Sequence, residues 1–206
     1  MKKIVFVTLP LKGKIKKCVY PVDGNALLEI KEPIQFAATA ALANSLKADD
    51  EVKVILLETK GGENAGKENA KLFEEELDHF NKVGAKITYK ILPSAFDMSK
   101  TNFQFMFKAI LKELEHDAEI YADTTYGPKP LAFLLFTVCQ FAEKFFDCSI
   151  GYIVYSKVEF KDNEIIDGSQ MIYDITPLYL MQNFTNMIET SSSEQAIRTI
   201  EALFED

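Results

Sequence analysis

One short segment of the chain, residues 123–129, gathers groups that suit the binding of an anion. It reads Asp123, Thr124, Thr125, Tyr126, Gly127, Pro128 and Lys129. The threonines offer hydroxyl groups, and Gly127 lets the backbone approach a ligand or adopt a positive φ. Pro128 is typical of a first helical residue, so free N–H groups and the positive end of a helix dipole are expected there. The positive end of a helix dipole disfavours a cation, so Lys129 at this place suggests an anion bound between the helix end and the lysine ammonium. The alternative is a capped strand-to-helix turn with an incidental lysine.

A second segment, residues 8–17, reverses the sign of charge locally. It holds four lysines, and no acidic residue precedes Asp23, although the whole chain carries a formal charge of −8. Lysine is a flexible point charge that suits phosphate binding where arginine is scarce, and Arg198 is the single arginine of the sequence. The segment is therefore either a positive rim for a phosphorylated ligand or a solvated loop.

Length and composition exclude several classes of protein. The chain has 206 residues, of which 48% are hydrophobic and 26% charged. These values fit one globular domain over residues 1–206, and they exclude a disordered, collagen-like or disulfide-stapled chain. The negative net charge argues against a protein that coats long DNA or RNA by neutralising phosphates. A nucleotide ligand would need a local basic pocket instead.

The cysteines and the apolar runs indicate the compartment. Cys18, Cys139 and Cys148 are odd in number and far apart, so we expect reduced, mostly buried thiols. The apolar run after Lys3 is too short for a signal peptide, and the longest one, residues 131–139, is too short to span a bilayer. The sequence predicts a cytoplasmic protein with no membrane segment of its own.

Strand-like and helix-like segments alternate along most of the chain. Apolar strand patterns fall at 4–7, 52–58, 86–92 and 119–123, and helical patterns at 33–47, 65–82, 99–115 and 128–146. Four successive β-α units predict a Rossmann-like, mostly parallel α/β sheet with helices on both faces and right-handed crossovers. With the strand order 3-2-1-4, the loops after Val7 and Ala122 lie side by side where such sheets bind ligands.

The alternation of strand and helix patterns ends after residue 149, and we expect the core to cover residues 1–149. Segments 150–160 and 164–174 flank a turn at Asp162-Asn163, which predicts a β-hairpin. Two short helices follow, with caps expected at Thr176 and Ser191. The hairpin and these helices complete the single domain.

The helix predicted over 128–146 is apolar around most of its circumference. Its narrow polar stripe consists of Lys129, Thr137, Gln140, Glu143 and Lys144. A helix of this kind is buried on more than one side. The sheet covers one side, and a further element or a second subunit must cover the other. We expect a homodimer.

Several common enzyme signatures are missing from the sequence. It contains no G-x-G-x-x-G, no G-x-x-x-x-G-K-[ST] and no G-x-S-x-G motif, and no His/Cys cluster with metal-ligand spacing. His79 and His116 are expected on polar helix surfaces, and residues 74–76, three glutamates, on a solvated face. We therefore expect no metal, no cofactor and no fast general acid–base nuclease.

The segment 123–129 resembles the Asp-x-Thr-x-Gly-x-Lys signature of CARF domains, the CRISPR-associated Rossmann folds. Residues 172–178, which read Ile-Tyr-Asp-Ile-Thr-Pro-Leu after the hairpin, are also similar to CARF-type sensors. The resemblance covers most of the chain. It implies a homodimer that binds a cyclic oligoadenylate, a second messenger of type III CRISPR antiviral defence, across its two-fold axis. A ring of four nucleotides is favoured over one of six.

The resemblance also implies which residues bind the ring. They are Thr8, Leu9, Pro10 and Lys12 in the first loop, and Asp123, Thr124, Thr125, Tyr126, Gly127 and Lys129 in the second. The pair Leu9-Pro10 replaces the glycine-containing start that is usual in the family, so the contacts of the first loop do not align.

Two functions follow from the resemblance. The first is a sensor domain, either alone or as part of a longer effector. The second is a metal-independent ring nuclease, in which a ribose 2′-hydroxyl attacks its own phosphate and leaves a cyclic phosphate. There Lys129 would steady the developing charge and Thr8 or Thr125 would position the phosphate, so that Lys129 and Thr8 are the candidate catalytic residues.

Overall fold

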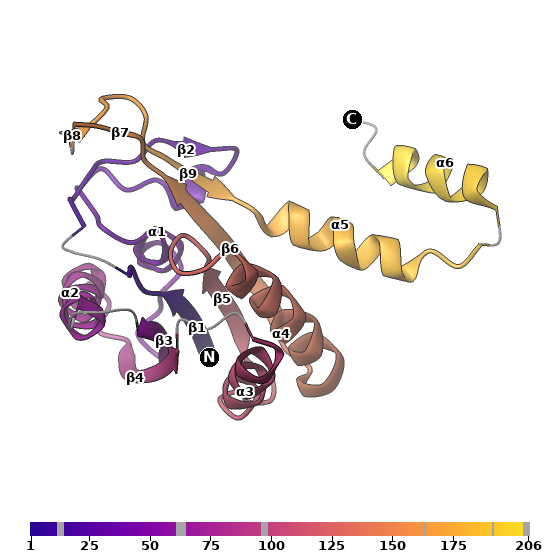
Figure 1. Cartoon of the computed structure of the whole chain (residues 1–206), viewed down its shortest axis with the longest axis horizontal. Helices are drawn as coiled ribbons and strands as arrows, with labels where there is room; N and C mark the ends of the chain where they lie inside the picture. Colours follow the sequence, from indigo (N-terminus) through magenta and orange to yellow (C-terminus); the bar gives the residue numbers. More distant parts are fainter. Residues whose placement is uncertain (12–14, 61–64, 96–98, 163, 191, 204–206) are drawn as a thin grey trace.

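A seven-stranded sheet with helices on both faces forms the centre of the molecule (Figure 1). The computed structural model describes residues 1–11, 15–60, 65–95, 99–162, 164–190 and 192–203. The strands of the sheet are β1 (Lys2–Thr8), β2 (Val22–Asp23), β3 (Glu51–Lys60), β4 (Lys86–Ala95), β5 (Glu119–Asp123), β6 (Ser149–Lys157) and β9 (Met171–Asp174). A separate hairpin pairs β7 (Phe160–Lys161) with β8 (Glu164–Ile165). The predicted Rossmann-like α/β class is confirmed.

The order of the strands places the two segments of interest together. The sheet runs β2-β9-β6-β5-β1-β3-β4, which contains the predicted order 3-2-1-4 as β4, β3, β1 and β5. β1 pairs in parallel with β3 and with β5, and Val7 lies opposite Asp123. The ends of β1 and β5 therefore meet at one border of the sheet, which we call the carboxyl edge.

β6 is a fifth parallel strand as well as one arm of the predicted hairpin. It pairs in parallel with β5 and antiparallel with β9. The sheet thus continues beyond residue 149, where the core was expected to end. The sequence pattern indicated only the hairpin and not the parallel pairing with β5, because β6 and β9 pair across a turn at Asp162, whose φ is +52°. Residues 155–157, at the end of β6, reach the carboxyl edge.

Two helices cover each face of the sheet. α1 (Ala37–Ala43) and α2 (Ala65–Phe80) pack on one face, and α3 (Lys100–Leu111) and α4 (Pro130–Phe146) on the other (Figure 1). α1 is shorter than the predicted 33–47. The chain before it is extended, because the backbones of Cys18 and Ile34 form an antiparallel bridge.

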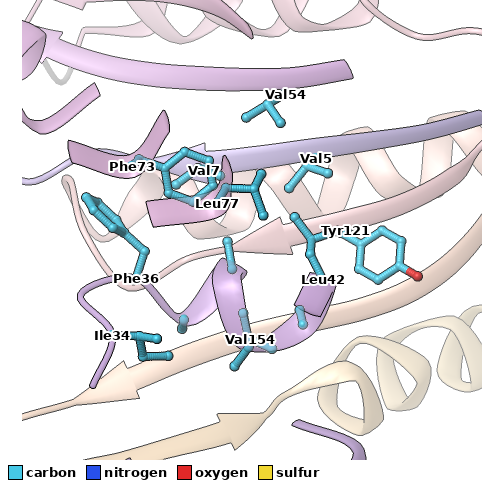
Figure 2. Close-up of a cluster of buried hydrophobic side chains, with 14 of the residues drawn as sticks. Val5, Val7, Ile34, Phe36, Leu42, Val54, Phe73, Leu77, Tyr121 and Val154 are labelled. Atoms are coloured by element: carbon cyan, nitrogen blue, oxygen red, sulfur yellow. The ribbon is translucent and has the colours of Figure 1, made fainter. Parts of the chain in front are cut away.

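The hydrophobic core has two halves, one on each face of the sheet. Val5 and Val7 of β1 contribute to the half beneath α1 and α2, where Phe36 and Phe73 meet edge to face (Figure 2). The alternate residues of β1 contribute to the half beneath α3 and α4. This alternation explains why β1 is a continuous apolar run, since a strand covered on both faces has no polar side.

Glu76 of α2 corrects the expectation that residues 74–76 form a solvated face. Its side chain is buried and accepts hydrogen bonds from the backbone N–H groups of Gln35 (2.7 Å) and Phe36 (3.1 Å) and from the hydroxyl of Thr39 (2.7 Å). The carboxylate thereby supplies acceptors to the amino end of α1, whose donors would otherwise be unpaired. It ties α2 to α1.

α4 is covered by its neighbours on part of its circumference only. Phe141 meets Phe107 of α3, and Phe136 meets the buried Tyr179 of α5 (Thr176–Met187). Phe133 and Phe145 remain 75% and 54% exposed. A further element therefore covers one side, as predicted, and a second apolar area faces outward in the single chain.

α5 and α6 (Ser193–Leu203) form an arm that extends away from the sheet (Figure 1). Thr176 was expected to cap α5, but it does not. Its hydroxyl instead accepts a hydrogen bond from the Ile153 N–H (2.9 Å) and so fixes the arm to β6. Ser191, the expected cap of the second helix, lies outside the described residues. None of the helices in the described part of the chain is long and apolar enough to cross a membrane.

Candidate functional site at the carboxyl edge

Thr8, at the end of β1, joins the two loops of the carboxyl edge. Its hydroxyl donates to the carbonyl of Asp123 (2.9 Å) and accepts from the N–H of Tyr126 (3.0 Å). The side chain is fully buried. Both of its hydrogen-bonding roles are used within the protein, so Thr8 is a positioning residue that cannot reach a phosphate in this conformation.

Asp123, at the end of β5, is buried as well. Its two carboxylate oxygens accept from the N–H groups of Ala38 (2.9 Å) and Thr125 (2.9 Å). Burial raises the pKa of the Asp123 carboxyl above its ordinary value, and the N–H donors oppose that rise. Asp123 therefore links the 123–129 loop to α1 and shapes the loop from below rather than contacting a ligand.

The three residues after Asp123 are also held by the fold. The N–H of Thr124 donates to the carbonyl of Val154 (3.0 Å), and the hydroxyl of Thr125 accepts from the N–H of Ser156 (2.9 Å). The phenol of Tyr126 donates to the carbonyl of Gln35 (3.2 Å), and burial raises its pKa. Three strands and the start of α1 thus fix one loop conformation, and Thr124, Thr125 and Tyr126 stay partly exposed at its surface.

Gly127 and Lys129 form the part of the loop that can meet an anion. Gly127 has φ +80°, and a Cβ at this position would lie 3.3 Å from Leu131. Lys129 is exposed, and within the described residues its ammonium has no ion pair and the N–H groups of Gly127 and Lys129 have no acceptor. One full positive charge and two free backbone donors therefore lie together at the start of α4.

The helix itself offers fewer donors than the sequence suggested. α4 begins at Pro130 rather than at Pro128, and neither proline has an N–H. The next two N–H groups, of Leu131 and Ala132, already donate to the carbonyls of Pro128 (2.8 Å) and Lys129 (3.2 Å). The expectation of several free helical N–H groups was wrong, because a tight turn consumes them. Binding there must depend on Lys129 and the loop.

The structure buries two of the residues that were predicted to bind a ligand from the first loop. Leu9 and Pro10 are buried, and the N–H of Leu9 donates to the carbonyl of Leu57 (3.1 Å). Lys12 lies outside the described residues. Lys16 forms an ion pair with Glu164 of β8, which connects the first loop to the β7–β8 hairpin.

A cavity of about 230 Å³ opens beside the 123–129 loop. It is lined by residues from the first loop, the 123–129 loop, the end of β6 and the β7–β8 hairpin, and we call it the tyrosine cavity. Its walls are Ile15, Lys16, Tyr20, Thr125, Tyr126, Tyr155, Ser156, Lys157, Val158, Phe160 and Ile165. Of these residues, only Thr125 and Tyr126 were predicted from the sequence to bind a ligand. Recognising β6 as a parallel strand would have pointed to residues 155–157, because its end must then lie at the carboxyl edge.

A second cavity, of about 250 Å³, lies at the opposite border of the sheet and carries no comparable charge. Its lysines Lys2, Lys3, Lys53 and Lys86 each form an ion pair with a nearby glutamate. The charges of its walls are thus compensated within the fold. Lys129 at the carboxyl edge differs, because within the described residues nothing compensates it.

Neither histidine lines the tyrosine cavity. His79 and His116 are exposed, as predicted. His79 lies in the last turn of α2, and His116 follows α3. Cys18, Cys139 and Cys148 are buried free thiols, and burial raises the pKa of each. Among the residues that the structure describes, no group of three or more His, Cys, Asp or Glu side chains could hold a metal ion. What the described edge offers is charge, backbone donors and an aromatic cavity.

No family model matches the chain, and no curated protein matches it. Its function therefore has to be inferred from the chemistry of the carboxyl edge and from the motif at 123–129.

Proposed function

We propose that this chain is a sensor domain that binds a cyclic oligoadenylate, the second messenger of type III CRISPR antiviral defence, as a homodimer in the cytoplasm. The observation that carries the proposal is the exposed Lys129 in the loop after the central strand β5: among the described residues nothing pairs with its ammonium or accepts from the N–H groups of Gly127 and Lys129. The CARF-like pattern of residues 123–129 names the ligand.

The charge of such a ring suits this edge. A cyclic oligoadenylate carries one negative charge per nucleotide, and a ring of four, which we favour, has two-fold symmetry. Two copies of the chain around a two-fold axis place two copies of Lys129 and its backbone donors on one ring. The lysine charge attracts the phosphates locally although the chain as a whole carries −8.

The outward apolar residues of α4 and of the arm support the dimer. Phe133 and Phe145 are exposed on α4, and Leu178, Met181 and Met187 are exposed on α5. Exposed apolar side chains gathered on two neighbouring helices indicate an interaction surface. Because α4 begins at the ligand loop, a dimer contact along α4 would bring the two loops near one axis.

Isothermal titration calorimetry with cyclic tetra-adenylate and cyclic hexa-adenylate tests the proposal. We expect one ring to bind per two chains, with the four-membered ring preferred. Lys129→Glu should abolish binding, since it replaces attraction with repulsion at the phosphate contact. Lys82→Glu makes the same charge change at an exposed position after α2 and should leave the affinity unchanged. Failure of both rings to bind the parent protein would refute the proposal.

A ring nuclease is the alternative function of the same edge, favoured by Lys129 and the partly exposed Thr125. The 2′-oxygen attacks the adjacent phosphorus, the bond to the 5′-oxygen breaks, and a 2′,3′-cyclic phosphate and a 5′-hydroxyl result. Lys129 would stabilise the charge on the phosphate, and Thr8 would act only by positioning the loop. Incubation of excess protein with each ring in a chelator, followed by chromatography, decides; an intact ring after long incubation excludes cleavage.

A further inference from the structure

The tyrosine cavity differs chemically from the phosphate contact beside it. Four aromatic side chains, Tyr20, Tyr126, Tyr155 and Phe160, contribute to its walls. Its volume of about 230 Å³ is below the roughly 300–1,000 Å³ of sites that enclose a whole drug-sized ligand. It therefore suits one flat group of a larger ligand, and aromatic walls favour a group with a π-face.

The hydroxyl of Tyr20 is buried close to Cys18 and Ser156, yet among the described residues it makes no hydrogen bond of ordinary geometry. The residue as a whole is 4% exposed. Leaving such a group unpaired is costly, because it has lost water without gaining a protein partner. A ligand that carries a hydrogen-bonding edge into the cavity would supply the missing partner.

The charges at the mouth of the cavity favour a neutral group over a phosphate. Lys16 pairs with Glu164, and Lys157 pairs with Glu159 (2.5 Å). Each lysine is thus compensated by a carboxylate that would repel an anion. Lys129 has no such partner among the described residues, so phosphate is expected at Lys129 and the uncharged part of the ligand in the cavity.

The two places belong to one site because they share a loop. Thr125 and Tyr126 line the cavity, and Gly127 and Lys129 follow them directly. Thr125 to Lys129 is four residues, which span at most about 14 Å even when extended. A ring with one phosphate at Lys129 can therefore place a base of the same or of a neighbouring nucleotide in the cavity.

We propose that the tyrosine cavity binds one nucleobase of the ligand, with Tyr155 and Phe160 against the face of the base and the Tyr20 hydroxyl on its polar edge. This inference rests on the proposed function for the identity of the base as adenine. It assigns specificity to residues from the first loop, β6 and β7, outside the 123–129 motif.

Tyr20→Phe and Tyr155→Ala test the base site. Tyr20→Phe removes only the unpaired hydroxyl, so the melting temperature of the free protein should stay the same or rise. Both variants should bind cyclic tetra-adenylate at least about ten-fold more weakly, because stacking and the edge contact are lost. Tyr89→Phe is the matched control and should bind as the parent does. Tyr89 lies on the edge strand β4, and its hydroxyl donates a hydrogen bond to Asp78.

Saturation-transfer NMR gives a second readout that does not depend on any variant folding. With the parent protein we expect saturation to reach the adenine H2 and H8 protons more strongly than the ribose protons. Unchanged affinity in both variants, or weaker saturation of the base than of the ribose, overturns the base site. If Lys129→Glu still abolishes binding in that case, the proposed function stands without it.

A failure of the proposed function can also be told apart from a failure of the base site. If the parent protein binds no cyclic oligoadenylate, the proposed function fails, and adenosine 5′-monophosphate and ribose 5-phosphate then test the cavity alone. Binding of the first but not the second, lost in Tyr20→Phe, supports a base site. Equal binding of both compounds, or of neither, shows that the cavity holds no base and overturns the inference.

Discussion

Polar residues at the carboxyl edge divide into those that build the loop and those that remain available. Thr8 and Asp123 are fully buried, and each makes two hydrogen bonds within the protein. Lys129 is exposed, and its ammonium has no ion pair within the described residues. A motif residue can therefore be essential to a binding loop without touching the ligand, because a loop needs buried partners to keep one conformation.

Gly127 permits a residue-scale test that separates backbone strain from crowding. Gly127→Ala places a side chain at φ +80° and 3.3 Å from Leu131, whereas Gly24→Ala faces the same strain at φ +82° with open space around it. Both should lower the free energy of unfolding by about 1–2 kcal/mol. Only Gly127→Ala should also weaken ring binding in calorimetry, since its methyl group displaces the donors at the start of α4. Equal affinities in the two variants would contradict a role for this backbone.

Between helices and strands, buried polar side chains form hydrogen bonds and ion pairs that hold one element in place against another. Glu76 attaches α2 to the start of α1, and Thr176 attaches the arm to β6. Glu113, after α3, does the same for the outer strands. Its buried carboxylate pairs with Lys53 of β3 (3.3 Å) and Lys90 of β4 (2.7 Å).

The Glu113 pair makes stability depend on pH in a defined direction. Burial acts to raise the pKa of Glu113, but the hydrogen bonds and charges of Lys90 and Lys53 outweigh it, so the pKa lies below its ordinary value of 4.5. A lowered pKa in the folded state means that the ionised form stabilises the fold above about pH 4.5 and that this contribution is lost on acidification. Glu113→Gln should therefore lower the free energy of unfolding at pH 7 by about 1–2 kcal/mol, both lysines being partly solvated.

Urea denaturation of the Glu113→Gln variant and its parent between pH 7 and pH 3 measures this effect. The difference between the two curves should shrink as the pH falls below about 4.5, where the parent loses its ionised carboxylate. Glu115→Gln is the control. Glu115 pairs with Lys2 and Lys53 but is only partly buried, so its loss should change stability by less than about 0.5 kcal/mol. A difference that does not vary with pH would contradict the assignment.

For the whole molecule, the sheet and its four flanking helices form a body from which the arm of α5 and α6 extends (Figure 1). The arm contributes one fully buried large side chain, Tyr179, to the described core. Helices with an unburied apolar side depend on further packing for stability. The proposed dimer would supply that packing.

Phe133 provides a test of the dimer that leaves the monomer intact. Because its ring is 75% exposed, Phe133→Glu should not change the fold of one chain. We expect light scattering to give twice the chain mass of 23.3 kDa for the parent and a single chain for Phe133→Glu. Phe105→Glu changes a similarly exposed ring on α3 and should remain dimeric. A parent protein that is monomeric with and without the ring would refute the dimer.

The layers of the fold, and the meeting of β1 and β5 at the carboxyl edge, could be predicted from the sequence alone. Continuous apolar runs at β1, β3 and β5 require cover on both faces, and this is a local property of each segment. The order of β-α units then places the ends of β1 and β5 together. Capping positions and the start of α4 were less well predicted, because these depend on hydrogen bonds between distant segments, such as Ile153 to Thr176.

Which groups face outward at the carboxyl edge could be seen only in the folded chain. Thr8 and Tyr126 lie 118 positions apart and meet through one hydrogen bond. Tyr20 comes from the loop after β1, Tyr155 from β6 and Phe160 from β7, and they line a cavity that no spacing along the chain encodes. The period of a strand or helix is a local signal, whereas burial of a side chain depends on what packs over it. The exposure of Lys129 and the burial of the Tyr20 hydroxyl therefore became visible only once the chain was folded.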